Sequence, residues 1–133
     1  MRFLLDTNIC IYLINKKDAG LLRKIQTCRN DDIAISTITI AEMEYGVSKS
    51  SKTHQNRLAL ATFLIPFSAL DFDQEAATEY GIIRTWLEAN GKQVGPMDML
   101  IAAQARSKGL ILVTNNEKEF AQVPGLAVED WTK

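Results

Sequence analysis

The sequence has 133 residues, 47% hydrophobic and 23% charged, which is enough for one domain with its own core and is an ordinary soluble composition. No apolar run approaches the ~20 residues that cross a bilayer, and Asp6 ends the first apolar stretch too early for a signal peptide, so we expect a cytoplasmic protein without a membrane partner. The net charge of −1 neither supports nor excludes nucleic acid, because acids gathered around a metal would leave the rest of the chain basic.

Short apolar runs alternate along the chain with longer segments of helical periodicity. No repeat, low-complexity tract or linker divides the sequence, so we expect a single domain over residues 1–133. The apolar runs predict strands at residues 3–5, 33–35, 67–70 and 110–113, and a last short strand near 126–128.

The segments between these runs predict helices, because apolar residues recur there at helical spacing. Three such faces are formed by Leu21, Ile25 and Cys28, by Ile38, Ala41 and Tyr45, and by Leu58, Ala61 and Ile65. Asp73 is a good N-cap for a longer helix that ends at Asn90-Gly91. Pro96 favours the first position of a further helix, with Met97, Leu100 and Ile101 turned inward. Strands that alternate with helices predict an α/β fold class, with a parallel sheet covered on both faces.

Acidic side chains follow several of the expected strands, at the edge of the sheet where parallel α/β folds bind ligands. Asp6 follows the first strand directly, and Glu42 lies about one turn into the helix after the second. Asp98 lies in the first turn of a later helix, and Glu119 comes soon after the strand at 110–113. Clustered acids repel each other unless a cation is present, and hard oxygen ligands suit Mg²⁺ or Mn²⁺. The pattern therefore indicates a metal site.

Each of these acids also has a purely structural interpretation, as a residue that stabilises the start of a helix. Asp6 suits an N-cap, Asp98 suits the positive end of a helix dipole, and Glu42 with Thr39 and Glu119 with Asn116 fit the capping box. Helix capping does not require every acid to lie at one end of one sheet, so we favour the metal site.

Several other chemistries lack the residues that they need. His54 is the only histidine and lies in a polar stretch, which argues against paired-histidine, Ser-His-Asp and histidine-rich zinc sites. No glycine-rich phosphate loop follows a strand. Cys10 and Cys28 show no metal-type spacing and are expected to be reduced and structural, and Trp86 and Trp131 to be packing residues.

With these residues in view, the sequence resembles the PIN-domain ribonucleases, and among them the VapC toxins of bacterial toxin–antitoxin pairs. The matching segments are, in chain order, 4–8, 41–46, 98–103, 112–116, 119–120, 124–126 and 129–131. No single segment is decisive, but the ordered set at these spacings is highly specific. The resemblance implies a PIN-like three-layer α/β/α fold with a central, mostly parallel sheet of about five strands.

The resemblance also implies a site in which Asp6, Glu42 and Asp98 gather Mg²⁺, with Mn²⁺ as an alternative ion. Asp6 and Asp98 would be the most direct ligands. Glu42 or Glu119 would orient or deprotonate the attacking water. One-metal and two-metal mechanisms both fit the sequence.

The fourth acid of this site departs from the common pattern. Many relatives carry an aspartate where this chain has Asn116, so either Glu119 supplies the charge or Asn116 acts as a neutral ligand. Thr114, with Asn116 and Asn8, is expected to position a water or the scissile phosphate.

For function, the resemblance implies a Mg²⁺-dependent endoribonuclease toxin that cuts structured RNA and so inhibits translation. The expected substrate is tRNA cut in the anticodon loop, with initiator tRNA implied by the members most like this chain. A VapB-type antitoxin is expected to neutralise the enzyme. We expect a homodimer within a larger complex that binds operator DNA through the antitoxin.

Exposed apolar side chains give a hint of where such an antitoxin would bind. Ile11, Ile14 and Met43 are expected beside the acids, in an apolar groove that would suit an amphipathic helix. The alternative, that these residues belong to the core or to a dimer interface, stays open.

Three other functions remain to be weighed. A phosphoacceptor receiver domain would need a lysine at the end of the last major strand, where this chain has residues 114–116 and then Lys118. An inactive PIN-fold binding module is disfavoured by the intact Asp6, Glu42 and Asp98. A DNA nuclease stays open, because nothing in the sequence identifies a reader of the 2′-hydroxyl.

Overall fold

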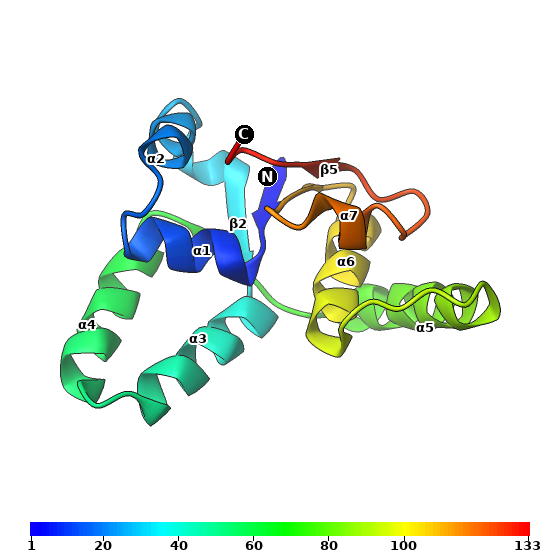
Figure 1. Ribbon diagram of the computed structural model, residues 1–133, viewed down its shortest axis with the longest axis horizontal. Helices are drawn as coiled ribbons and strands as arrows, with labels where there is room; N and C mark the ends of the chain where they lie inside the picture. Colours follow the sequence, from blue (N-terminus) through cyan, green and yellow to red (C-terminus); the bar gives the residue numbers. More distant parts are fainter.

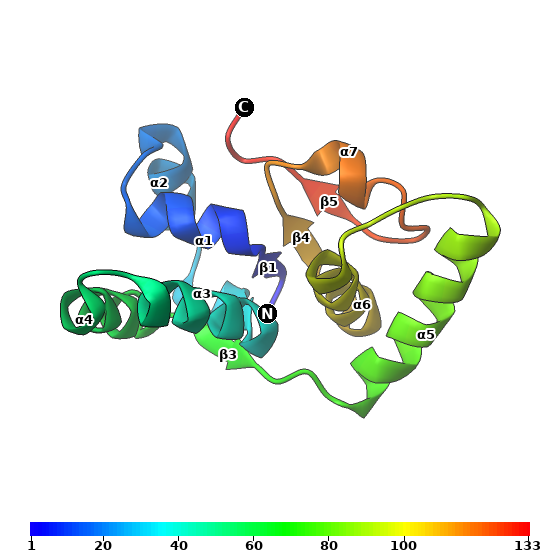
Figure 2. The same ribbon diagram turned by 60° about the horizontal axis from the view of Figure 1, so that its bottom comes forward.

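Five short parallel strands form the centre of the protein in a computed structural model that describes residues 1–133 (Figures 1 and 2). They are β1 (Phe3–Leu5), β2 (Ile33–Ser36), β3 (Ser68–Leu70), β4 (Ile111–Val113) and β5 (Val128–Glu129). Their order is β3-β2-β1-β4-β5, and every neighbouring pair is parallel. The chain moves outward from β1 to β3 and then returns to the other side of β1, so β1 and β4 flank the switch point at which such sheets bind ligands.

Helices cover both faces of this sheet, as the α/β prediction requires. They are α1 (Thr7–Ile14), α2 (Ala19–Gln26), α3 (Thr37–Lys49), α4 (Thr53–Leu64), α5 (Gln74–Ala89), α6 (Pro96–Lys108) and the short α7 (Glu117–Phe120), with one 3-10 turn, η1 (Asn30–Asp32). None of them combines the length and the apolarity that a bilayer-spanning segment needs.

Two separate clusters of buried apolar side chains hold the layers together. Successive side chains of a strand point to opposite faces, so Phe3 and Leu5 enter one cluster while Leu4 enters the other. The first cluster joins the sheet to α1–α4, and the second joins it to α5–α7. Figure 1 shows the two groups of helices on either side of the strands. The three-layer α/β/α prediction is confirmed.

The predicted ends of helices are most accurate where the sequence contains an N-cap residue or a proline. Asp73 caps α5 through a hydrogen bond from the backbone N–H of Ala76 at 3.0 Å, and α6 begins at Pro96. The last strand lies later than expected, at Val128–Glu129 in place of residues 126–128.

The predicted inward faces of two helices are wrong. In α3 the buried residues are Thr39, Met43 and Val47, whereas the predicted face contains Tyr45, which is 66% exposed. In α4 Leu60 is buried, whereas the predicted face of Leu58, Ala61 and Ile65 is exposed. Both helices carry apolar residues on more than one side, so periodicity alone does not select the face that packs. Two smaller errors concern Cys28, which lies beyond the end of α2, and Met97, which is exposed.

A buried glutamine joins the two halves of the fold beneath the carboxyl edge of the sheet. Gln104 of α6 is fully buried; its Oε1 accepts a hydrogen bond from the Ser36 hydroxyl, and its Nε2 donates to the carbonyl oxygen of Leu70 at 2.9 Å. The Ser36 hydroxyl oxygen in turn accepts from the backbone N–H of Ile38 and caps α3. One side chain therefore links α6 to the ends of β2 and β3.

Replacing Gln104 with leucine should destabilise the protein without a large change in volume. Gln104→Leu leaves the Ser36 hydroxyl and the Leu70 carbonyl without their partner, so we expect the free energy of unfolding in urea to fall by about 2 kcal/mol. Gln55→Leu, on the exposed side of α4, is the matched control and should change it by less than about 0.5 kcal/mol. Equal losses would contradict the link.

Candidate active site

Asp6 lies at the switch point of the sheet, where β1 passes into α1. Its Oδ1 accepts the backbone N–H of Ile9 at 2.9 Å, so it caps α1 as the structural interpretation predicted. Its Oδ2 accepts the hydroxyl of Thr114, which follows β4 and is itself buried. The side chain is only 3% exposed. Asp6 therefore caps a helix and also belongs to the acid cluster.

Glu42 reaches the same edge from the second turn of α3. Its Oε1 accepts the hydroxyl of Thr7, the first residue of α1, at 2.6 Å. The Thr7 hydroxyl oxygen also lies 3.2 Å from that of Thr39. The cap of α3 is Ser36, so the interpretation of Thr39 and Glu42 as a capping box is wrong. Glu42 is instead tied to the start of a different helix.

Asp98 and Glu119 face each other across the loop that precedes α6. Glu119 Oε1 accepts the backbone N–H of Gly95 at 2.8 Å, and its Oε2 accepts the Asn116 side-chain amide at 2.5 Å. Glu119 also lies close enough to Asp98 to raise the pKa of that carboxyl group. Both crowd Gly95, since a Cβ there would lie 3.4 Å from Asp98 Oδ2 and 3.7 Å from Glu119 Oε1. The Asn116 side chain does not cap α7.

Two of the four carboxyl groups have a raised pKa. Burial first, and then the charges of Glu119, Asp6 and Glu42, together raise the pKa of Asp98 to about 7. Burial also raises the pKa of Asp6, with help from Glu42, although hydrogen bonds from Thr114 and Ile9 oppose the shift. None of the four forms an ion pair with a basic side chain. The cluster thus lacks a counter-charge from the protein.

The carboxylate oxygens of the cluster are of a type that binds divalent cations, although the side chains do not converge on one point. No three Asp, Glu, His or Cys side chains converge closely enough to hold an ion in this arrangement, in which Glu42 is hydrogen bonded to Thr7 and Glu119 to Gly95 and Asn116. The available ligands are all carboxylate oxygens, which suit Mg²⁺ or Mn²⁺. A cation bound here would favour the ionised form of Asp98, against the raised pKa of that group.

Of the three residues predicted to position water or phosphate, two hydrogen bond to the acids and one does not. Thr114 lies under Asp6 and orients that carboxylate, and Asn116 is exposed and holds Glu119. Asn8 is exposed on α1, and its side chain forms no hydrogen bond within the protein.

The sequence analysis missed Asp130, whose charge also raises the pKa of Asp6. It follows β5 directly, so the strand-end pattern would have found it had that strand been placed correctly.

Comparison with known proteins gives a consistent set of matches. Residues 3–126 match the family model described as the PIN domain. The chain is 44% identical to Ribonuclease VapC2 of Rickettsia felis, over 100% of both chains, and 42% identical to the tRNA(fMet)-specific endonuclease VapC of Shigella flexneri, over 99% of both.

Solved structures agree with these sequence matches. VapBC2 from Rickettsia felis, bound to a DNA fragment from its promoter, aligns with a TM-score of 0.93 and 43% identity over 98% of this chain and 99% of that one. DNA-bound VapBC from Salmonella typhimurium aligns with a TM-score of 0.94 and 39% identity over 98% of each chain.

The raised pKa of Asp98 predicts a pH dependence of stability in the absence of metal. The folded protein holds a proton on Asp98 more tightly than the unfolded chain, so the free energy of unfolding should fall as pH rises from about 4 to about 7. Asp98→Asn should remove this fall, and it should therefore raise the melting temperature more at about pH 8 than at about pH 5. Glu117→Gln, whose side chain is partly exposed at the start of α7, is the control. The same shift at both pH values would contradict the repulsion among these acids.

Proposed function

The chain belongs to the PIN-domain family and is an endoribonuclease of its VapC group, and we propose that it is the Mg²⁺-dependent toxin of a type II toxin–antitoxin pair. The observation that carries the proposal is the meeting of Asp6, Glu42, Asp98 and Glu119 at the switch point of the sheet, with no basic side chain to neutralise them. Such a cluster is suited to binding a metal and hydrolysing a phosphodiester.

The proposed substrate is tRNA, cut in the anticodon loop, and initiator tRNA is the first candidate. Two relatives, from Shigella flexneri and Salmonella typhimurium, are named tRNA(fMet)-specific endonucleases. A single-stranded loop suits a site at the edge of a sheet, because its backbone can be splayed toward a recessed carboxylate cluster while that of a stacked helix cannot. Cleavage of initiator tRNA would stop translation at its first step.

We assign different roles to the four carboxylates. Asp6 and Asp98 would be the most direct metal ligands, with Glu42 and Glu119 nearby. When bound at these residues, a divalent ion would make a water more acidic and would stabilise charge on the phosphoryl oxygens. Thr114 holds Oδ2 of Asp6 and so orients the carboxylate toward the site.

The two glutamates differ in what their oxygens are free to do. Both oxygens of Glu119 accept hydrogen bonds, from Gly95 and Asn116, so we assign to this residue the supply of negative charge beside Asp98. Glu42 uses only Oε1, for Thr7, and its Oε2 has no donor within the protein. We therefore assign to Glu42 Oε2 the proton taken from the attacking water.

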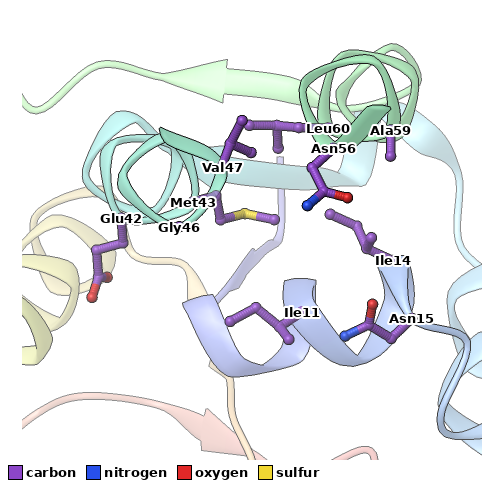
Figure 3. Close-up of a pocket in the computed structure, with 10 residues that line it drawn as sticks. All are labelled: Ile11, Ile14, Asn15, Glu42, Met43, Gly46, Val47, Asn56, Ala59 and Leu60. Atoms are coloured by element: carbon purple, nitrogen blue, oxygen red, sulfur yellow. The ribbon is translucent and has the colours of Figure 1, made fainter. Parts of the chain in front are cut away.

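The proposed partner is a VapB-type antitoxin, since the solved relatives are VapBC complexes. A groove of about 320 Å³ lies between α1, α3 and α4, with Glu42 at one end (Figure 3). Its walls include Ile11, Ile14 and Met43, the residues that the sequence suggested, and Ile11 is 39% exposed. An amphipathic antitoxin helix would bury this surface and carry a basic residue to the acids.

The same solved relatives support a proposal for a larger complex. The relatives from Rickettsia felis and Salmonella typhimurium are VapBC complexes bound to DNA, and we propose that this chain forms a homodimer whose antitoxin binds operator DNA. The receiver alternative is disfavoured, because no lysine bonds to the acids. An inactive binding module is distinguished by the next experiment.

Asp6→Asn and Asp98→Asn test the metal site directly. Asparagine also caps helices well, and Asp98→Asn relieves repulsion, so both variants should stay folded. We expect each to reduce Mg²⁺-dependent cleavage of tRNA at least about 100-fold and to abolish growth arrest on expression without antitoxin. Asp31→Asn, an exposed acid paired with Arg29, is the control. Folded variants with full activity would show that the acids do not form the active site.

Glu119→Gln tests the fourth acid against its neighbour. Loss of this charge removes one of the acids around the proposed ion and should slow cleavage by about tenfold or more, as loss of a supporting group around a metal does. Glu117→Gln removes an exposed acid that pairs only with Lys133, at 3.0 Å, and should change the rate by less than about twofold. Equal and mild effects would mean that Glu119 only shapes the start of α7.

A further inference from the structure

Two hollows border Glu119 on the side of the acid cluster away from α3. The first, of about 610 Å³, lies between the second half of α5, the loop at residues 92–95 and the start of α6. The second, of about 390 Å³, lies beside α7. Glu119 and Gln93 line both, and Gln122 Nε2 donates to the carbonyl oxygen of Gln93 at 3.0 Å between them. We call the two together the α5–α7 groove.

The lining of this groove combines an apolar floor with cationic and amide side chains. Leu87, Val94 and Met99 contribute the apolar surface of the first hollow. The polar side chains around the groove are Arg84, Lys92, Gln93, Asn116, Lys118 and Gln122, together with the acids Glu88 and Glu119. Amides and cations are the groups that bind phosphate and sugar, while apolar surface contacts bases and ribose.

The charges of the groove are available to a ligand. Lys92 and Lys118 are exposed, and neither forms an ion pair within the protein. Arg84 is engaged by Glu88 at 3.3 Å and by the Tyr80 hydroxyl at 2.9 Å, so the two lysines are the free cations.

The groove between α1, α3 and α4 has the opposite character. Six of its ten lining residues are hydrophobic, and its one charged side chain is the acidic Glu42. The acid cluster is thus approached by an apolar groove at Glu42 and, at Glu119, by a polar groove that carries two unpaired lysines.

We propose that the α5–α7 groove holds the RNA strand on one side of the scissile phosphate, with Lys92 and Lys118 bound to its phosphates. The inference rests on the proposed function, because it takes RNA as the substrate. Glu119 is both a wall of the groove and the partner of Asp98, so a strand lying there leads directly to the acids. The apolar groove has no lysine or arginine to bind a phosphate, and it is left for the antitoxin.

The test compares two charge-matched double variants. Lys92→Gln with Lys118→Gln removes the groove cations. Lys17→Gln with Lys52→Gln removes two exposed, unpaired lysines from the connections α1–α2 and α3–α4, away from α7 (Figure 1). Both are assayed for Mg²⁺-dependent cleavage of a tRNA anticodon stem-loop, and for binding of the same RNA in EDTA over a range of KCl concentrations.

For the groove variant we expect KM to rise about tenfold while kcat changes less than about twofold, because phosphate contacts remote from the reacting atoms bind substrate and transition state alike. The slope of log affinity against log salt should lose about 0.7 for each lysine. The control should match the wild type in both measurements, and circular dichroism should show both variants folded.

Three other results would show whether the inference, the proposed function or both are wrong. Unchanged KM and salt slope in the groove variant overturn it, while wild-type cleavage keeps the proposed function standing. If the wild type cleaves no RNA, the proposed function fails, and binding in EDTA still decides whether the lysines hold RNA. If the groove variant loses affinity for antitoxin but not for RNA, the groove is a protein-binding surface and the inference is wrong.

Discussion

Four carboxyl groups share one edge of the central sheet with no basic side chain among them, and the surrounding structure has to offset their repulsion. It does so with hydrogen-bond donors drawn from separate elements: a hydroxyl after β4 for Asp6, a hydroxyl on α1 for Glu42, and a backbone N–H before α6 for Glu119. The last acid, Asp98, has no such donor, and its burial together with the charges of Glu119, Asp6 and Glu42 raises its pKa to about 7. Only a correctly folded chain brings these donors together, so fold and site depend on each other.

The position of the cluster also divides the surface around it. On the α3 side the neighbouring groove is apolar and ends at Glu42, which suits a helix of a partner protein (Figure 3). On the α7 side the groove is polar, ends at Glu119 and carries free lysines, which suits a nucleic-acid backbone. An inhibitor and a substrate can thus reach the same acids from different directions, and they compete only where the two routes meet.

The sequence could predict the meeting of the acids because a parallel sheet brings the carboxyl ends of its strands to one edge, and spacing alone placed Asp6 and Asp98 there. It could not predict the partners that hold them. The bond from Thr7 to Glu42 spans 35 residues, and such pairings follow from helix packing that periodicity does not specify. The same limit explains the wrong inward faces of α3 and α4, which are apolar on several sides. Asp130 was missed because a strand of only two residues has almost no pattern.

If Mg²⁺ binds at these carboxyl groups, it must displace the proton that the raised pKa of Asp98 favours, so the number of protons released on Mg²⁺ binding tests the proposed site. Calorimetric titration of the purified protein with Mg²⁺ at about pH 6, in two buffers of different ionisation enthalpy, measures the protons released per ion bound. The account predicts release of up to about one proton, which declines above about pH 8 and disappears in Asp98→Asn. Binding of Mg²⁺ with no proton release at any pH, or with release unchanged by that substitution, would contradict it.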